Sequence, residues 1–295
     1  MQIQEGFMPF QGYQTYYRIV GELDNGQTPL LLLHGGPGST HNYFEAFDEL
    51  TATTGRPIVM YDQLGCGRSD MPDAPQLWRA STWVAELQAL RDYLGLTKLH
   101  LLGQSWGGML AIIYLCDHQP QGIQSLTLAS TLSSARLWAQ EQHRMIGFMS
   151  ATDQTAIAQA ESSGDFTTPA YLTANQHFMT RHAAGPVTAA SPEFLRRPTR
   201  QGTVAYNVAW GPNEYSPTGT LRDYEYTAKL ADLTTPTLVT SGVNDLCTPL
   251  VAKTMVDQLP HAEWTLFAHS RHMAFIEEPT AYRTRLAAWL QQNDS

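Results

Sequence analysis

Short, continuous runs of apolar residues recur in the first half of the chain and again near its end. The runs cover residues 29–34, 57–61, 98–102, 125–129, 236–241 and 264–267. Runs of this length that are apolar throughout and bounded by Gly or Pro are typical of parallel strands buried on both faces. The aromatic and β-branched segment from Tyr13 to Val20 predicts an additional, antiparallel strand before them.

Segments with helical spacing lie between these runs. Trp83, Leu87, Leu90 and Leu94 recur at steps of four, three and four, which predicts a helix over about 81–94. A second helix is expected from Gly107 to about His118, and a third after Pro279. The alternation of strand and helix predicts an α/β protein with a mostly parallel, doubly wound sheet and helices on both of its faces.

The pattern changes between residues 132 and 231. This stretch is rich in Ala, Gln, Thr, Arg and Met, contains no run typical of a buried strand, and is broken by glycines and prolines. We therefore predict that residues 1–131 and 232–295 form the sheet domain. Residues 132–231 are expected to form an inserted, mainly helical cap.

Composition and charge exclude several classes of protein. The 295 residues are 43% hydrophobic and 15% charged, which is typical of a globular domain with a sizeable core. A net charge of -9 argues against a nucleic-acid partner, because phosphate binding needs a basic surface. No apolar run is long enough to predict a membrane span, and the pattern of the first twenty residues does not predict a secretory leader. The three scattered cysteines form no C-x-x-C pair. A soluble cytoplasmic protein without a membrane partner is the expectation.

The strongest chemical motif is the G-x-S-x-G sequence at residues 103–107, centred on Ser105. It follows one of the apolar runs and precedes a helix of small residues. In that context the serine is expected on a tight strand-to-helix turn, with its hydroxyl exposed as a nucleophile. The flanking glycines relieve the crowding that larger side chains would cause there, and the helix directs its N-terminal N–H groups at the reacting atoms.

A serine hydroxyl needs a base and an acid that orients the base. In a strand–turn–helix arrangement of this kind the partners follow later in the chain, in the order acid then histidine. Asp245 stands just after the strand predicted at 236–241, and two histidines, His269 and His272, follow the strand predicted at 264–267. Spacing alone allows either histidine. The loop that leads from His272 into the final helix favours His272. The ten histidines show no H-E-x-x-H, so no metal site is expected.

A second glycine-rich loop, His34 to Gly38 (HGGPG), follows the strand predicted at 29–34. Acyl transfer places negative charge on a carbonyl oxygen, and two preset backbone N–H donors can stabilise it. We expect Trp106, the residue after the nucleophile, to supply one donor and Gly36 to supply the other. Pro37 lacks an N–H and cannot contribute.

Five segments together resemble the proline iminopeptidase group of α/β-hydrolases, which includes the tricorn-interacting aminopeptidase factor. They are HGGPG at 34–38, YDQLGCGRSD at 61–70, GQSWGG at 103–108, WGPNEY at 210–215 and HSRHMAFIEEP at 269–279. The resemblance covers nearly the whole chain. It implies the α/β-hydrolase fold with a helical cap, release of an N-terminal residue, often proline, from short peptides, and no cofactor. It also supports His272 as the base.

An aminopeptidase must bind a free ammonium group, and burying that charge is costly without an anionic partner. A carboxylate in the cap is therefore expected, and the resemblance assigns this role to Glu214. Some relatives carry a second acid directly after the triad aspartate, where this chain has Leu246. Tyr43, Phe44 and Trp210, with Trp106, are candidates to line an apolar pocket for a proline ring or small side chain.

Three other functions remain open at this point. The same triad serves L-amino-acid amidases and esterases acting on amino-acid amides, and also aminopeptidases with broad specificity. The fold is also used by ligand receptors that hydrolyse slowly or not at all, although a complete triad and oxyanion loop argue against that reading. Dehalogenases and epoxide hydrolases are disfavoured because they use an aspartate where this chain has Ser105.

Overall fold

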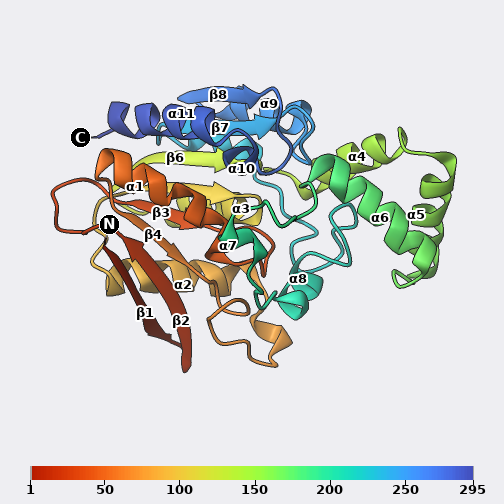
Figure 1. Cartoon of the computed structure of the whole chain (residues 1–295), viewed down its shortest axis with the longest axis horizontal. Helices are drawn as coiled ribbons and strands as arrows, with labels where there is room; N and C mark the ends of the chain where they lie inside the picture. Colours follow the sequence, from red (N-terminus) through yellow and green to blue (C-terminus); the bar gives the residue numbers. More distant parts are fainter. Residues whose placement is uncertain (1, 295) are drawn as a thin grey trace.

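In the computed structural model, which describes residues 2–294, eight strands form one sheet in the order β1-β2-β4-β3-β5-β6-β7-β8 (Figure 1). The strands are β1 (Ile3–Phe10), β2 (Tyr13–Val20), β3 (Leu30–Leu33), β4 (Ile58–Tyr61), β5 (Leu99–Gln104), β6 (Ile123–Ala129), β7 (Thr237–Gly242) and β8 (Ala262–Phe267). β2 pairs antiparallel with β1 and β4, and every other pair is parallel. The predicted mostly parallel sheet is confirmed.

Helices cover both faces of this sheet. They are α1 (Asp48–Thr54), α2 (Ala80–Tyr93), α3 (Trp106–Ile113), α9 (Pro249–Gln258), α10 (Ala274–Glu277) and α11 (Pro279–Gln292). Strand β3 is apolar throughout because both of its faces are buried. Leu31 and Leu33 pack with α2 and α3, while Leu30 and Leu32 pack with α11 on the other face. All four leucines are fully buried. The strand run thus reflects two cores, one on each side of the sheet.

Strand β1 has no counterpart among the predicted elements. It is an edge strand whose first half is largely exposed, and Gly6 and Pro9 interrupt its hydrophobic pattern. Its place is set by β2, to which it is joined through Gln11 and Gly12, both with positive φ. The residues of β1 therefore become a strand because they pair with β2, and not because of a local hydrophobic pattern.

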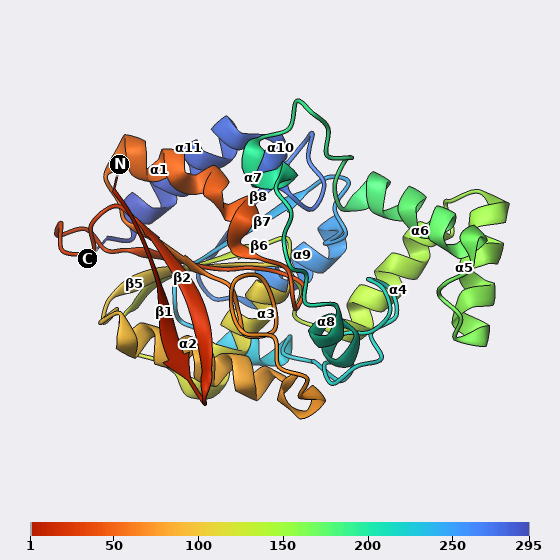
Figure 2. The same ribbon diagram turned by 60° about the horizontal axis from the view of Figure 1, so that its bottom comes forward.

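The chain between β6 and β7 is helical in the structure. It contains α4 (Ala135–Ile146), α5 (Ala151–Ser163), α6 (Pro169–His182), α7 (Glu193–Arg196) and α8 (Thr203–Ala209). Figures 1 and 2 show α4, α5 and α6 together at one end of the molecule, beyond the carboxyl ends of the parallel strands, whereas α7 and α8 lie closer to the sheet.

One extended segment of this region lies directly on two core loops. The N–H of Gly202 donates to the carbonyl of Gly38 over 2.7 Å, and the N–H of Gly67 donates to the carbonyl of Arg200 over 2.7 Å. The approach is close enough that a Cβ on Gly38 would lie 2.5 Å from the Gly202 oxygen. These contacts place the segment that precedes α8 over the loop after β3, where the pocket begins.

Candidate active site

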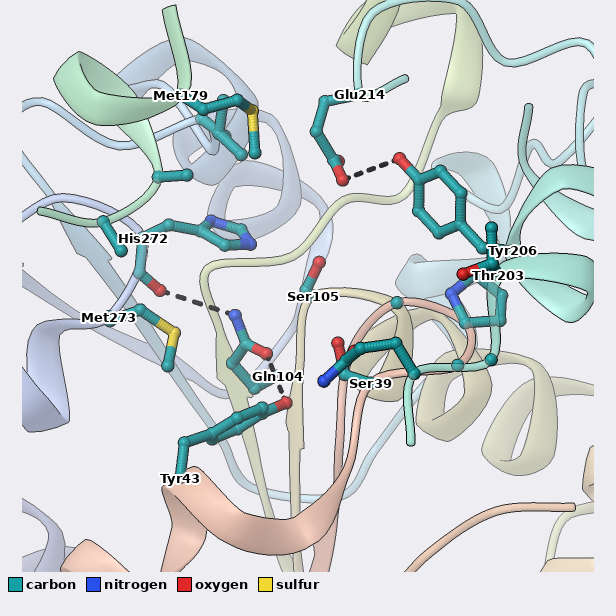
Figure 3. Close-up of a pocket in the computed structure, with 18 residues that line it drawn as sticks. Ser39, Tyr43, Gln104, Ser105, Met179, Thr203, Tyr206, Glu214, His272 and Met273 are labelled. Atoms are coloured by element: carbon teal, nitrogen blue, oxygen red, sulfur yellow. Dashed lines mark hydrogen bonds between the residues drawn. The ribbon is translucent and has the colours of Figure 1, made fainter. Parts of the chain in front are cut away.

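A pocket of about 390 Å³ opens at the carboxyl ends of the central strands, beneath the helical region. Its walls come from the loops after β3, β5, β7 and β8 and from segments around α6 and α8. The lining comprises Gly36, Pro37, Gly38, Ser39, Tyr43, Gln104, Ser105, Met179, Ala183, Ala184, Gln201, Gly202, Thr203, Tyr206, Glu214, Leu246, His272 and Met273. Figure 3 shows the Ser105 hydroxyl pointing into the space between the His272 ring and Glu214.

Ser105 occupies a sharp turn between β5 and α3. Its backbone angles are φ 56° and ψ -123°, a conformation that costs on the order of 1–3 kcal/mol for a residue with a side chain. The neighbouring glycines make the turn possible. A Cβ on Gly103 would lie 2.2 Å from the Gly107 oxygen, and one on Gly107 would lie 1.9 Å from the Leu33 oxygen. The G-x-S-x-G spacing therefore follows from the close approach of β5, α3 and β3.

Asp245 and His272 meet although 27 positions separate them in the chain. The distance from His272 Nδ1 to Asp245 Oδ1 is 2.6 Å, and the Asp245 carboxylate is completely buried. A charged acceptor of this kind holds the proton on Nδ1 and leaves Nε2 free to accept one from a hydroxyl. His269 is exposed, and only its backbone N–H contacts an acid, Glu278. The structure thus brings His272 rather than His269 to the aspartate.

The Asp245 carboxylate has a full set of donors besides the imidazole. Oδ1 also accepts from the Cys247 N–H at 2.8 Å, while Oδ2 accepts from Ser130 Oγ at 2.6 Å and from the Gly242 N–H at 3.1 Å. These bonds satisfy a buried negative charge and fix its orientation. Sequence reasoning did not identify Ser130. The one sequence feature that could have indicated Ser130 is its position directly after a buried strand, β6, which lies beside β7.

The pKa of His272 reflects opposing influences. Burial by itself lowers the pKa, because it disfavours the charged imidazole. The charge of Asp245 and its hydrogen bond raise the pKa, with smaller contributions from Glu214 and Glu277, and together they outweigh burial. The pKa therefore lies above the ordinary value of 6.5, so that the imidazolium formed by proton transfer is stabilised.

The two backbone N–H groups expected to form an oxyanion hole are those of Gly36 and Trp106, the residue that opens α3. Both are free of a protein acceptor within residues 2–294. The N–H of Gly35, in contrast, donates to Tyr43 Oη over 2.6 Å and is not available. Gly36 has φ 111°, a region suited to glycine. Gly36 lines the same pocket as Ser105, and Trp106 directly follows Ser105 in the chain.

Glu214 lies in the pocket wall opposite the core loops. Its Oε1 accepts a hydrogen bond from Tyr206 Oη at 2.8 Å, and its carbonyl oxygen accepts from Trp138 Nε1 at 2.8 Å. Burial raises the pKa of the Glu214 carboxyl, while the Tyr206 hydrogen bond and the charge of His272 partly offset the effect. A carboxylate destabilised by burial is suited to bind a cation. Sequence reasoning missed Tyr206, because nothing but the fold brings α8 to Glu214.

Of the four aromatic residues expected to line the pocket, only one does so in the structure. Tyr43 faces the pocket, where its hydroxyl donates to Gln104 Oε1 at 2.9 Å (Figure 3). Phe44 is fully buried and its ring packs 5.9 Å from that of Phe47. Trp210 is 3% exposed and lies outside the pocket lining. The expectation of a pocket role for Phe44 and Trp210 is therefore corrected, because packing turns both rings into the interior.

The ring of Trp106 likewise lies outside the pocket lining. The indole packs edge-to-face against Trp83, with centroids 5.1 Å apart, and is buried. Leu246, which directly follows Asp245, does line the pocket. Within residues 2–294, Glu214 is therefore the only acidic side chain in the pocket lining.

The described residues, 2 to 294, contain no cluster of three His, Cys, Asp or Glu side chains arranged to hold a metal ion. No helix within the same range is both long and apolar enough to cross a membrane.

Comparison with protein families gives a match to the alpha/beta hydrolase fold over residues 28–279. The chain is 75% identical over 294 residues to the proline iminopeptidase of Levilactobacillus brevis, covering 100% of this chain and 98% of that protein. It is likewise 75% identical over 287 residues to the proline iminopeptidase of Lactiplantibacillus plantarum, with 97% and 100% covered.

Solved structures agree with these relatives. A crystal structure of proline iminopeptidase from Mycobacterium smegmatis superposes with a TM-score of 0.86 at 32% identity, covering 98% of both chains. The crystal structure of VinJ superposes with a TM-score of 0.91, also at 32% identity, covering 98% of this chain and 99% of that one.

Proposed function

Because the chain belongs to the proline iminopeptidases of the α/β-hydrolase family, we propose that it releases an N-terminal proline from short peptides through an acyl-enzyme on Ser105. The observation that carries the mechanism is the meeting of a strained serine, a buried Asp–His pair and one carboxylate around a single pocket. The family alone would not assign these roles to individual residues.

In the acylation step, Ser105 Oγ attacks the prolyl carbonyl carbon while His272 Nε2 takes the hydroxyl proton. Asp245 keeps the imidazole in the required tautomer and stabilises its positive charge. The N–H groups of Gly36 and Trp106 stabilise the negative charge on the carbonyl oxygen. When the peptide C–N bond breaks, His272 returns the proton to the departing amine.

In the second step a water molecule attacks the prolyl ester. His272 takes a proton from this water, and the carbonyl oxygen again becomes an anion in the same hole. As the C–O bond to Ser105 breaks, His272 gives the proton to Ser105 Oγ, which releases proline and restores the serine hydroxyl and the neutral imidazole. No atom besides those of substrate, water and the three side chains is needed to balance either step.

Glu214 binds the free amino group of the substrate. A buried ammonium is costly unless a negative charge pairs with it, and Glu214 is the acid that the pocket offers. A carboxylate on the wall opposite Ser105 also limits the enzyme to the first residue of the peptide, because a longer N-terminal extension would meet this wall. Residues 132–231 form the cap. It carries Glu214 and closes the pocket around the first residue of the peptide.

The amidase, esterase and receptor alternatives gain no specific support. Several relatives of high identity carry the name proline iminopeptidase, which favours peptides over simple amides as substrates. A cytoplasmic location agrees with the cysteines, since Cys66, Cys116 and Cys247 are all free thiols.

The test is hydrolysis of prolyl arylamide, with and without an acetyl group on the prolyl nitrogen, by the wild type and Ser105→Ala. We expect rapid cleavage of the free amine, little of the acetylated form, and loss of about 10³-fold or more in the variant. Ser125→Ala is the control, because Ser125 is buried beside His100 near the amino end of β6 and lies outside the pocket lining. Equal cleavage of free and acetylated substrates by the wild type would contradict the proposal.

A further inference from the structure

Gln63 lies in the loop that follows β4 and is 1% exposed, yet it does not line the pocket. The proposed reaction gives it no chemical role. A buried amide has two donors and two acceptor sites that must be satisfied, so its partners show what the residue holds in place.

The partners of Gln63 are the two segments that carry the oxyanion donors. Nε2 donates to the carbonyl oxygen of His34 over 3.0 Å, and Oε1 accepts from Trp106 Nε1 over 2.7 Å. His34 opens the glycine loop that contains Gly36, and Trp106 is itself the second donor residue. One side chain thus spans the loop after β3 and the first turn of α3.

The backbone of Gln63 sets the state of the His34 ring. Its N–H donates to His34 Nε2 over 3.0 Å, so that nitrogen is an acceptor and the ring proton lies on Nδ1. Nδ1 lies 2.9 Å from the carbonyl oxygen of Gly35 and donates to it. Burial lowers the pKa of His34 to about 4, which keeps this neutral form over the range in which His272 can act as a base.

The bond to the Gly35 carbonyl determines where the Gly36 N–H points. The two groups belong to the same peptide unit, in which C=O and N–H of a planar trans peptide point in opposite directions. The Gly35 oxygen is held on one side by His34 and by the Ser39 N–H at 3.3 Å. The Gly36 N–H must therefore face the other side, where Gly36 borders the pocket.

We propose that Gln63 is a positioning residue of the oxyanion hole, which ties the His34 loop to Trp106 and so sets the spacing and direction of both N–H donors. The inference rests on the acyl transfer at Ser105 proposed above, but it does not depend on which acyl group is transferred. Gln63 acts through His34 and Trp106 and touches no substrate atom.

Gln63→Met tests this role, because it keeps the length of the side chain and removes both hydrogen bonds. Loss of one oxyanion donor costs about 10²–10³-fold in kcat. Since Gln63→Met displaces the donors without removing them, we expect kcat to fall about 10- to 100-fold and KM to change less than threefold. Affinity for a boronic acid, which forms a tetrahedral adduct with serine, should fall in parallel, while inhibition by free proline stays within threefold.

Gln63→Glu supplies a second, pH-dependent readout. An ionised carboxylate accepts from Trp106 but repels the His34 carbonyl, whereas its protonated form can donate to that carbonyl and restore both bonds. The kcat of this variant relative to wild type should therefore rise as the pH falls. A merely structural role would lower thermal stability without this trend.

Ser125→Ala serves as the control, since it also removes a buried hydrogen bond, the 2.8 Å contact with His100, far from the pocket. It should change melting temperature but leave kcat and boronate affinity within twofold of wild type. Wild-type kcat and boronate affinity in folded Gln63→Met would overturn the proposal. Equal losses of affinity for the boronic acid and for free proline in Gln63→Met would also overturn the proposal.

The same kinetics measured with an activated acetyl ester separate this inference from the proposed function. If the wild type cleaves the ester but not prolyl arylamide, the prolyl specificity fails, and the effect of Gln63→Met on the ester still decides its role. If Gln63→Met impairs neither reaction while wild type cleaves both, the positioning role alone fails.

Discussion

The hydroxyl of Tyr206 donates to Glu214 Oε1 across 2.8 Å, and this contact joins helix α8 to the pocket wall (Figure 3). The other carboxylate oxygen, Oε2, has no hydrogen-bond partner within residues 2–294. One oxygen is thus held by the protein, and the other remains to accept from the ammonium group of a substrate. Two predictions follow from this pairing, one for each residue.

Removal of the tyrosine hydroxyl should weaken binding of the amino group. Tyr206→Phe removes the bond that orients the Glu214 carboxylate and lowers its pKa, so that the acid is less well placed and less ionised, and KM for prolyl arylamide should rise about 10-fold. The kcat should change less. Tyr226→Phe is a matched control, because Tyr226 also donates to a carboxylate, that of Asp117, outside the pocket. Equal effects of the two substitutions would contradict the prediction.

Neutralising the carboxylate itself should discriminate between substrates. Glu214→Gln leaves a buried ammonium without its counter-charge, and kcat/KM for prolyl arylamide should fall about 100-fold or more. For the N-acetylated substrate the change should stay within about threefold, since no charge is then bound. Glu193→Gln, which removes one exposed charge from the same region, controls for net charge. Parallel losses with both substrates would rule out the assigned role.

The pH dependence follows from the environment of His272. Only the neutral imidazole can act as the base, and Asp245 together with Glu214 and Glu277 raises the pKa against the lowering effect of burial. The kcat/KM for an ester without an amino group should therefore rise with pH, with its midpoint above 6.5.

The same profile measured on Glu214→Gln should shift in a defined direction. The substitution removes one of the negative charges that stabilise the imidazolium of His272, so the midpoint should move to lower pH. An upward shift, or a wild-type midpoint below 6.5, would show that the electrostatic account is wrong.

The turn at Ser105 should tolerate no side chain at Gly107. In Gly107→Ala the new Cβ would lie 1.9 Å from the Leu33 oxygen, a backbone atom that cannot move without displacing β3. We expect a loss of about 2–4 kcal/mol in the free energy of unfolding, measured by urea denaturation.

Gly164→Ala controls for the loss of a glycine as such. Gly164 has φ 72° but open space around it, so the substitution should cost about 1–2 kcal/mol from backbone conformation alone. A Gly107→Ala protein no less stable than Gly164→Ala would disprove the steric argument.

The sequence by itself determined which residues stand at the ends of the buried strands. Ser105 and Asp245 could be selected because each follows a short apolar run, and parallel strands bring their carboxyl ends to one edge. Gly36 was selected in the same way. The last run left both His269 and His272 open, and the loop into the final helix together with the family resemblance favoured His272. The mostly parallel sheet and the helical stretch before β7 were also readable, since burial on two faces and helical periodicity leave local patterns.

Tertiary structure alone decided which side chains of the same type reach the pocket. Tyr43 and Phe44 are neighbours, yet the first lines the pocket and the second packs in the core, because packing and not residue type sets the direction of a ring. Ser130, Tyr206 and Gln63 act through partners distant in the chain. A hydrogen bond between residues far apart in sequence leaves no local pattern, and only the folded chain reveals it.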